Sequence, residues 1–134
     1  MVKLKKVIAI SSYIMLFSIS SAFAHEFPSQ KGECFLVKNN IPQKNYNCTI
    51  NSGGGAGGSY TTFKINKANV LIEENETSDR LLIGNDFESL EDGTFYYRNL
   101  KDRKIITIQK ARNTPAYYCA KQSKGHLDAC YITD

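Results

Sequence analysis

Hydrophobic and polar residues alternate over short stretches of this chain, and turn-forming residues separate one stretch from the next. The clearest alternation covers residues 60–65, and an apolar run returns at 70–72 after the polar turn 66–69, which predicts a hairpin. Further short strands are expected at residues 34–37, 46–50, 81–84, 95–98, 105–108, 116–121 and 129–132. About nine strands at this spacing predict a mainly all-β domain, either a small antiparallel β-sandwich or a barrel.

Helical signals are sparse in this pattern. Beyond the first apolar segment no helical period is sustained, and only residues 86–90 are expected to form one helical turn, behind a cap at Asn85 or Asp86. The Asp-Gly pair within residues 91–94 predicts a turn between strands, and the charged segment 101–104 predicts another. Strands and turns should therefore account for almost all of the domain.

The first 24 residues stand apart from this pattern. Three lysines among the first six residues precede an apolar run over residues 7–19, and Ala-Phe-Ala at 22–24 has the small residues that a signal peptidase recognises. The run is shorter than the roughly 20 residues that span a bilayer. We therefore expect residues 1–24 to be a removable signal peptide, followed by a flexible arm over 25–32 and one disulfide-stabilised β domain over 33–134.

Removal of the leader changes the charge of the protein. The whole chain has 17 Lys and Arg against 13 Asp and Glu, and three of the lysines lie in the leader, so 14 basic residues then face 13 acidic ones. A net charge near +1 does not predict binding to nucleic acid or to an anionic membrane. We expect a soluble periplasmic or secreted protein with no nucleic-acid partner and no membrane contact after cleavage.

All four cysteines follow the leader and should meet an oxidising compartment, which favours disulfides. Four cysteines allow three pairings, and the sequence alone does not choose among them. The local solution, Cys34–Cys48 with Cys119–Cys130, joins consecutive predicted strands and needs no long-range assumption. Zinc-type pairs and the C-x-x-C redox motif are both missing, so we expect neither a metal site nor disulfide-exchange chemistry.

A glycine-rich segment at residues 52–59, SGGGAGGS, contains five of the nine glycines. It lacks the lysine of a phosphate-binding loop, and it does not open a helix. It is either a flexible hairpin connection or a loop without side chains that enters a narrow cleft on a partner, because glycine permits close backbone approach. Its candidate binding residues are Gly53, Gly54, Gly55, Gly57, Gly58 and Tyr60.

Eight tyrosines and no tryptophan make up an unusual aromatic set. Two adjacent pairs, Tyr96-Tyr97 and Tyr117-Tyr118, lie on predicted strands, so one member of each pair should face outward. Exposed tyrosine is common in protein interfaces, which makes Tyr96 and Tyr97 candidate binding residues. The alternative is that outward tyrosines only pair across strands.

Candidate catalytic groups do not form a recognisable set. His25 would become the N-terminus after cleavage and could form a copper brace with His126, but nothing in the sequence places the two together. Ser123, His126 and Asp128 fall within one turn, whereas triad members normally come from separate segments. The acidic residues of 73–79 lack calcium-loop spacing and are expected in a solvated loop. Those of 88–92 could in principle supply paired carboxylates for glycoside hydrolysis, but two carboxylates on one turn are ordinary. We therefore assign no catalytic residue, no metal ligand and no cofactor.

The order of leader, first cysteine pair, glycine segment, alternating hairpin and C-terminal cysteines resembles short exported proteins of Gram-negative bacteria with no assigned activity. In size, compartment and β-plus-disulfide build the chain is also similar to periplasmic lysozyme inhibitors and to immunity proteins that block periplasm-directed effectors. The inhibitors' SG-x-x-Y loop is echoed by residues 57–60, while their tryptophan-lysine-glycine segment is missing, so no residue role is carried over. The likeness implies a protein partner, a hydrolase or toxin. The alternatives are a small secreted enzyme (a metal-dependent hydrolase or copper oxidase) and a structural envelope component.

Overall fold

A computed structural model describes residues 25–134, so the predicted signal peptide lies outside the described residues. These residues form one antiparallel sheet of 11 strands with two short helical segments. Among residues 25–134, no helix is long and apolar enough to cross a membrane. In chain order the elements are β1 (His25–Glu26), β2 (Gln30–Lys38), β3 (Ile41–Pro42), β4 (Tyr46–Gly55), β5 (Gly58–Ile65), β6 (Ala68–Asn75), β7 (Arg80–Gly84), the 3-10 helix η1 (Phe87–Ser89), β8 (Glu91–Asn99), β9 (Ile105–Ile106), α1 (Ile108–Asn113), β10 (Ala116–Gln122) and β11 (Asp128–Thr133).

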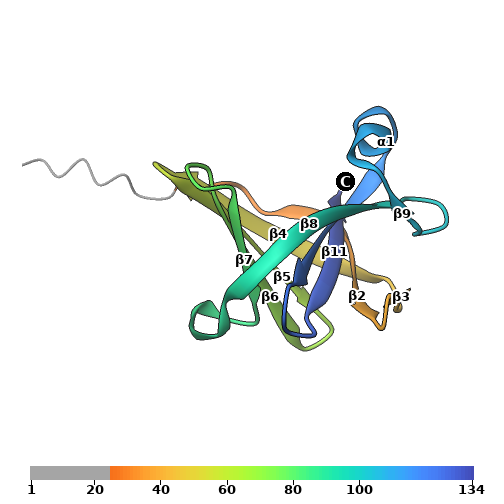
Figure 1. Cartoon of the computed structure of the whole chain (residues 1–134), viewed down its shortest axis with the longest axis horizontal. Helices are drawn as coiled ribbons and strands as arrows, with labels where there is room; N and C mark the ends of the chain where they lie inside the picture. The colour runs from red at the N-terminus through yellow and green to blue at the C-terminus, as the bar shows by residue number, and fades with distance from the viewer. Residues whose placement is uncertain (1–24) are drawn as a thin grey trace, which may run out of the picture.

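The main strands of the sheet close on themselves. In the order β2, β4, β5, β6, β7, β8, β10 and β11, each strand pairs antiparallel with the next, and β11 pairs with β2. The shorter strands β1, β3 and β9 add to the rim of this ring (Figure 1). The prediction of an antiparallel all-β fold is confirmed, and of the two expected architectures the closed one is formed.

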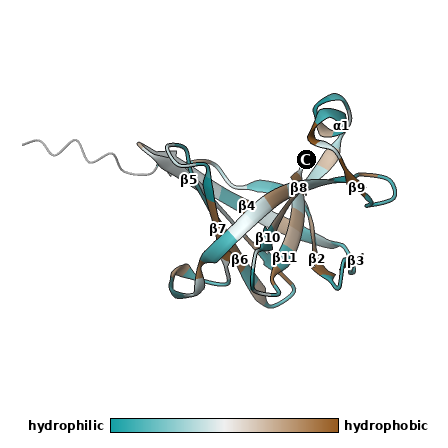
Figure 2. Ribbon diagram, viewed as in Figure 1, coloured by the Kyte–Doolittle hydropathy of each residue, from teal (hydrophilic) through white to brown (hydrophobic). Residues whose placement is uncertain are grey.

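Strand alternation turns every second side chain toward the inside of the ring, where a closed sheet of this size leaves room for side chains alone. The inner core draws on all the ring strands, with Phe95 of β8 packed against it, and the apolar segments of these strands are visible in Figure 2. Its buried members are Cys34, Cys48, Ile50, Phe63, Ile65, Val70, Ile72, Leu81, Ile83, Ala120 and Ala129.

The outward faces of β2, β10 and β11 carry a second, smaller apolar cluster. Its buried members are Phe35, Val37, Tyr117, Cys119 and Cys130. The Tyr117 ring stands edge-on to the Phe35 ring, with 4.9 Å between centroids. The Arg103 guanidinium carbon lies 4.9 Å from the Phe35 centroid, so a long cationic side chain shields this cluster from water.

Both expected disulfides are present. Cys34–Cys48 joins β2 to β4 inside the ring, and Cys119–Cys130 joins β10 to β11 in the outer cluster. The two cysteines of each disulfide lie on neighbouring, paired strands, as the local pairing predicts. One cross-link therefore stabilises each of the two apolar clusters.

The predicted turn at residues 91–94 is wrong. These residues begin β8, where Gly93 pairs with Leu81 on one side and Gln122 on the other. A Cβ on Gly93 would lie 2.6 Å from the carbonyl oxygen of Lys121, so glycine is required for the close approach of two strands. Glycine favours turns, but here it occupies a strand because neighbouring atoms leave no room for a side chain.

The strand expected over residues 105–108 is also wrong in part. Only Ile105–Ile106 forms a strand, β9, and α1 begins at Ile108. Thr107 caps this helix, since its hydroxyl accepts a hydrogen bond from the Lys110 amide. A local cap thus overrides the β preference of Ile108. The helical turn expected at residues 86–90 is present as η1, with Asp86 as its cap.

The first described residues have defined partners. His25 pairs with Gly54 and Glu26 with Gly53, so β1 lies along β4. The amide of Phe27 donates to the carbonyl oxygen of Ser52. β2 then starts at Gln30, three residues before the expected beginning of the domain.

Replacing Cys119 and Cys130 together with alanine should lower the free energy of unfolding by about 3 kcal/mol, because the disulfide closes a loop of 11 residues. Urea unfolding of the oxidised wild type and the variant measures this difference. In reducing buffer the wild type should lose at least as much stability, because both of its disulfides open. A loss under about 1 kcal/mol in the variant would contradict the expectation.

Candidate functional site

The glycine-rich segment is a regular extension of the sheet. β4 and β5 stay paired up to Gly55 opposite Gly58, so the connection between them is only Ala56 and Gly57. The tip lies at one extreme of the longest axis of the molecule, beside the turn between β6 and β7 (Figure 1). The segment is therefore a paired hairpin that carries nothing larger than a methyl group from residue 53 to residue 58.

Three of the hairpin glycines are required by the fold. A Cβ on Gly53 would come within 2.5 Å of the Tyr60 ring, and one on Gly58 within 2.6 Å of the carbonyl oxygen of Glu74. Gly57 has a φ of +96°, where other residues are strained. A Cβ on Gly54 would make only ordinary contacts of 3.5 Å and longer. The fold therefore does not require glycine at position 54.

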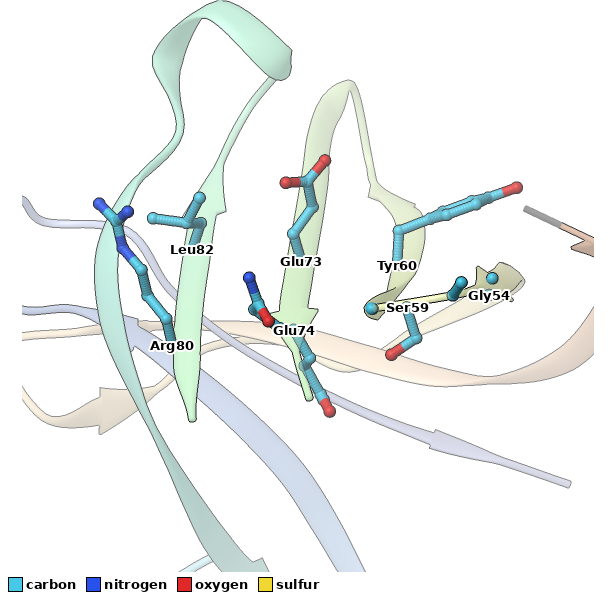
Figure 3. A pocket seen from close by; sticks show the side chains of 12 residues that line it. Gly54, Ser59, Tyr60, Glu73, Glu74, Arg80 and Leu82 are labelled. Atoms are coloured by element: carbon cyan, nitrogen blue, oxygen red, sulfur yellow. The ribbon is translucent and has the colours of Figure 1, made fainter. Parts of the chain in front are cut away.

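A cavity of about 330 Å³ lies between this hairpin and the β6–β7 hairpin. We call it the hairpin groove; Gly54, Gly55, Ala56, Gly57, Gly58, Ser59, Tyr60, Glu73, Glu74, Asn75, Arg80 and Leu82 line it. Figure 3 shows the Tyr60, Glu73 and Leu82 side chains rising from three adjacent strands on one face of the sheet, with Arg80 beside them. Glu74 and Ser59 point to the opposite face (Figure 3).

The surroundings of the hairpin groove are acidic. Glu73, Glu74, Glu76 and Asp79 lie on β6 and in the turn after it, and Glu26 lies on β1. The one ion pair among residues 25–134 joins Arg80 to Asp92 at 2.9 Å, with both side chains mostly exposed. The single cation at the groove is thus already partnered, and this end of the molecule attracts positive charge.

Glu74 connects the groove to the interior of the ring. Its carboxylate accepts a hydrogen bond from the Tyr118 hydroxyl at 2.8 Å. Burial raises the pKa of Tyr118 well above its ordinary value, and the bond to Glu74 adds to the effect. The Tyr97 ring lies 5.4 Å from Tyr118, so this predicted binding residue packs inside the sheet.

Tyr96 points to the other face of β8 but is also engaged. Its hydroxyl donates to the Asp128 carboxylate and accepts from Arg98 Nε at 3.3 Å. Arg98 is only 3% exposed and donates through its other nitrogens to Asn40 Oδ1 at 3.0 Å and to the carbonyl oxygen of Arg103 at 2.9 Å. Tyr96 therefore belongs to a buried polar network. Asn40 and Asp128 lie far from Tyr96 in the sequence, so no local pattern predicted this network.

The structure thus gathers part of the predicted binding set. Tyr60 and the five glycines meet at the hairpin, whereas Tyr96 and Tyr97 serve the outer network and the inner aromatic packing. His25 lies on β1 and His126 between β10 and β11, and residues 25–134 contain no cluster of three metal-ligating side chains. Glu73 and Arg80 also line the groove, but the sequence did not predict them as binding residues. Only the strand register brings them together, and the sequence does not show that register.

Comparison of the chain with protein-family models, with curated proteins and with solved structures finds no match.

The pH dependence of stability should report on Asp128. Burial raises the pKa of its carboxyl above the ordinary value of 3.8, against the opposing effects of Tyr96 and Arg98. A raised folded-state pKa stabilises the protein below the unfolded-state pKa, and this contribution is lost as the pH rises through the folded-state value. The Asp128→Asn variant should therefore gain stability relative to wild type as the pH rises above about 4.

Urea unfolding at several pH values measures this difference. Asp134→Asn, which removes an exposed carboxylate, provides the control and should parallel the wild type. A constant gap between wild type and Asp128→Asn across the pH range would contradict the expectation.

Proposed function

We propose that this protein is a periplasmic or secreted inhibitor, comparable to an immunity protein, that covers the active-site cleft of a hydrolase with the β4–β5 hairpin. The observation that supports this most directly is the hairpin itself: a paired, glycine-lined extension at one extreme of the molecule, next to an acidic groove. A lysozyme-like enzyme is the first partner to test.

The hairpin has the dimensions that a cleft requires. Two paired strands lie about 4.8 Å apart, and without side chains such a ribbon can enter a space that ordinary strands cannot. Its backbone is already ordered by pairing along β4, β5 and β1, so binding orders little additional chain. The disulfides support a rigid body behind it.

The charges beside the hairpin indicate the chemistry of the partner. Glu73 lines the hairpin groove, and the amide of Glu76 donates to the carbonyl oxygen of Gly57 at the hairpin tip. Neither carboxylate has an ion-pair partner among residues 25–134. Such a surface attracts a positively charged rim and accelerates association with it. We therefore infer a basic enzyme whose cleft lies between cationic side chains.

Inhibition by a variant with an obstructed tip tests the hairpin. Ala56→Trp adds a large side chain at an exposed turn position and should weaken inhibition of a responsive lysozyme-like hydrolase by at least about tenfold, since each 1.4 kcal/mol of lost binding is a factor of ten. Lys67→Trp, at the turn on the opposite end of β5, is the matched control and should inhibit like wild type.

Cell-wall lysis rates and calorimetric binding with purified residues 25–134 provide the measurements. A panel of lysozyme-like hydrolases should contain at least one enzyme that the wild type inhibits. Inhibition of none, or equal inhibition by wild type and Ala56→Trp, would contradict the proposal.

Removing the acidic charge should slow association. Glu73→Gln with Glu76→Gln is expected to reduce the association rate by about tenfold at low salt and to flatten its dependence on ionic strength. Glu88→Gln with Glu91→Gln removes the same charge from exposed positions away from the groove and should leave the rate unchanged. Stopped-flow mixing with the responsive enzyme measures both. Equal slowing by the two double variants would show that only net charge matters.

A further inference from the structure

The chain leaves the ring between β8 and β10. Residues 100–115, which we call the β9–α1 projection, contain β9 and α1 and extend from the end of the molecule far from the β4–β5 tip (Figure 1). Three large apolar side chains are exposed on it: Leu100 (39%), Ile105 (55%) and Ile108 (53%). They make up half of the six large hydrophobic residues that are exposed among residues 25–134. Such a concentration on a small projection indicates an interaction surface.

The same segment is strongly basic. Lys101, Lys104, Lys110 and Arg112 are exposed, and none of them forms an ion pair within the described part of the chain. Asp102 is the one acidic residue in the projection, and its carboxylate accepts a hydrogen bond from the Lys104 amide. Apolar side chains therefore stand among unpaired cations.

The projection is held in place by the buried network beneath it. The Arg98 guanidinium donates to the carbonyl oxygen of Arg103, whose amide donates to the carbonyl oxygen of Asn99. The amide of Asn99 in turn donates to the carbonyl oxygen of Lys104 at 2.8 Å, and Thr107 caps α1. The exposed isoleucines are thus presented by a preformed structure.

We propose that the β9–α1 projection docks the protein onto an anionic lipid bilayer. Ile105 and Ile108 enter the interfacial layer, and the four exposed cations lie against headgroup phosphates. A convex projection suits insertion between lipid headgroups, and exposed isoleucines would add nothing to binding a polyanion in water. The proposal does not depend on the inhibitor function, and it leaves the β4–β5 hairpin directed away from the surface.

The sequence-based expectation of no membrane contact rested on the net charge of about +1. That net charge averages over two separated, oppositely charged surfaces. The acidic residues 73–79 lie at the hairpin end, and the cations of residues 101–112 lie at the other (Figure 1). A bilayer would meet only the basic end, since electrostatic attraction is screened within about 10 Å at ordinary ionic strength.

Sedimentation with vesicles tests the proposal. Residues 25–134 should bind vesicles of phosphatidylglycerol and phosphatidylethanolamine at least about tenfold more tightly than vesicles of phosphatidylcholine. The variant Lys104→Glu/Lys110→Glu/Arg112→Glu should lose this binding. The matched control, Lys64→Glu/Lys121→Glu/Lys124→Glu, changes the net charge equally at exposed sites elsewhere and should keep most of it.

Ile105→Ser/Ile108→Ser separates insertion from adsorption. This variant should bind anionic vesicles only at low salt, whereas the wild type should stay bound at physiological salt. Equal binding to both vesicle types, equal loss in the two charge variants, or salt-resistant binding without the isoleucines would overturn the proposal. Tighter binding of the wild type to a DNA duplex than to vesicles, unchanged in the isoleucine variant, would also overturn it. Hydrolase inhibition by the same variants should be unaltered, so the two proposals can fail independently.

Discussion

Closure of the sheet depends on β2, which pairs with β11 along one edge and with β4 along the other. Gly32 makes this possible, because a Cβ there would lie 1.9 Å from the carbonyl oxygen of Ile132 on β11. Two residues further on, the disulfide Cys34–Cys48 links β2 to β4 at its other edge. Closing the ring pairs backbone groups that an open sheet would leave exposed along two edges, and it encloses the inner core. The rest of the structure follows from this junction.

A closed ring leaves its ends as the places where chemistry can vary. At one end the β4–β5 hairpin continues past the ring with a bare backbone, and carboxylates of β6 and the following turn surround it. At the other end the β9–α1 projection carries lysines, an arginine and exposed isoleucines. The body between them is closed by hydrogen bonds and two disulfides, so each end is positioned without relying on the other.

Much of the fold could be predicted from local pattern. Alternation at residues 60–65 and the apolar run at 70–72 predicted the hairpin that β5 and β6 form, and cysteines on consecutive strands predicted both disulfides. Local rules failed where crowding or a cap decided the outcome. Gly93 is a glycine because β10 approaches it closely, and Ile108 is helical because Thr107 caps the segment.

By itself, then, the sequence determined the class of fold and the glycine segment and favoured the local cysteine pairing, because these rest on residues close together in the chain. Which face a tyrosine occupies, which glycine is free of structural constraint and which charges gather at each end were decided only by the tertiary structure. Strand register sets those properties, and register depends on the packing of all eight ring strands at once. Tyr97 packs inside the ring and Tyr96 joins a buried arginine for this reason, although the two are neighbours in sequence.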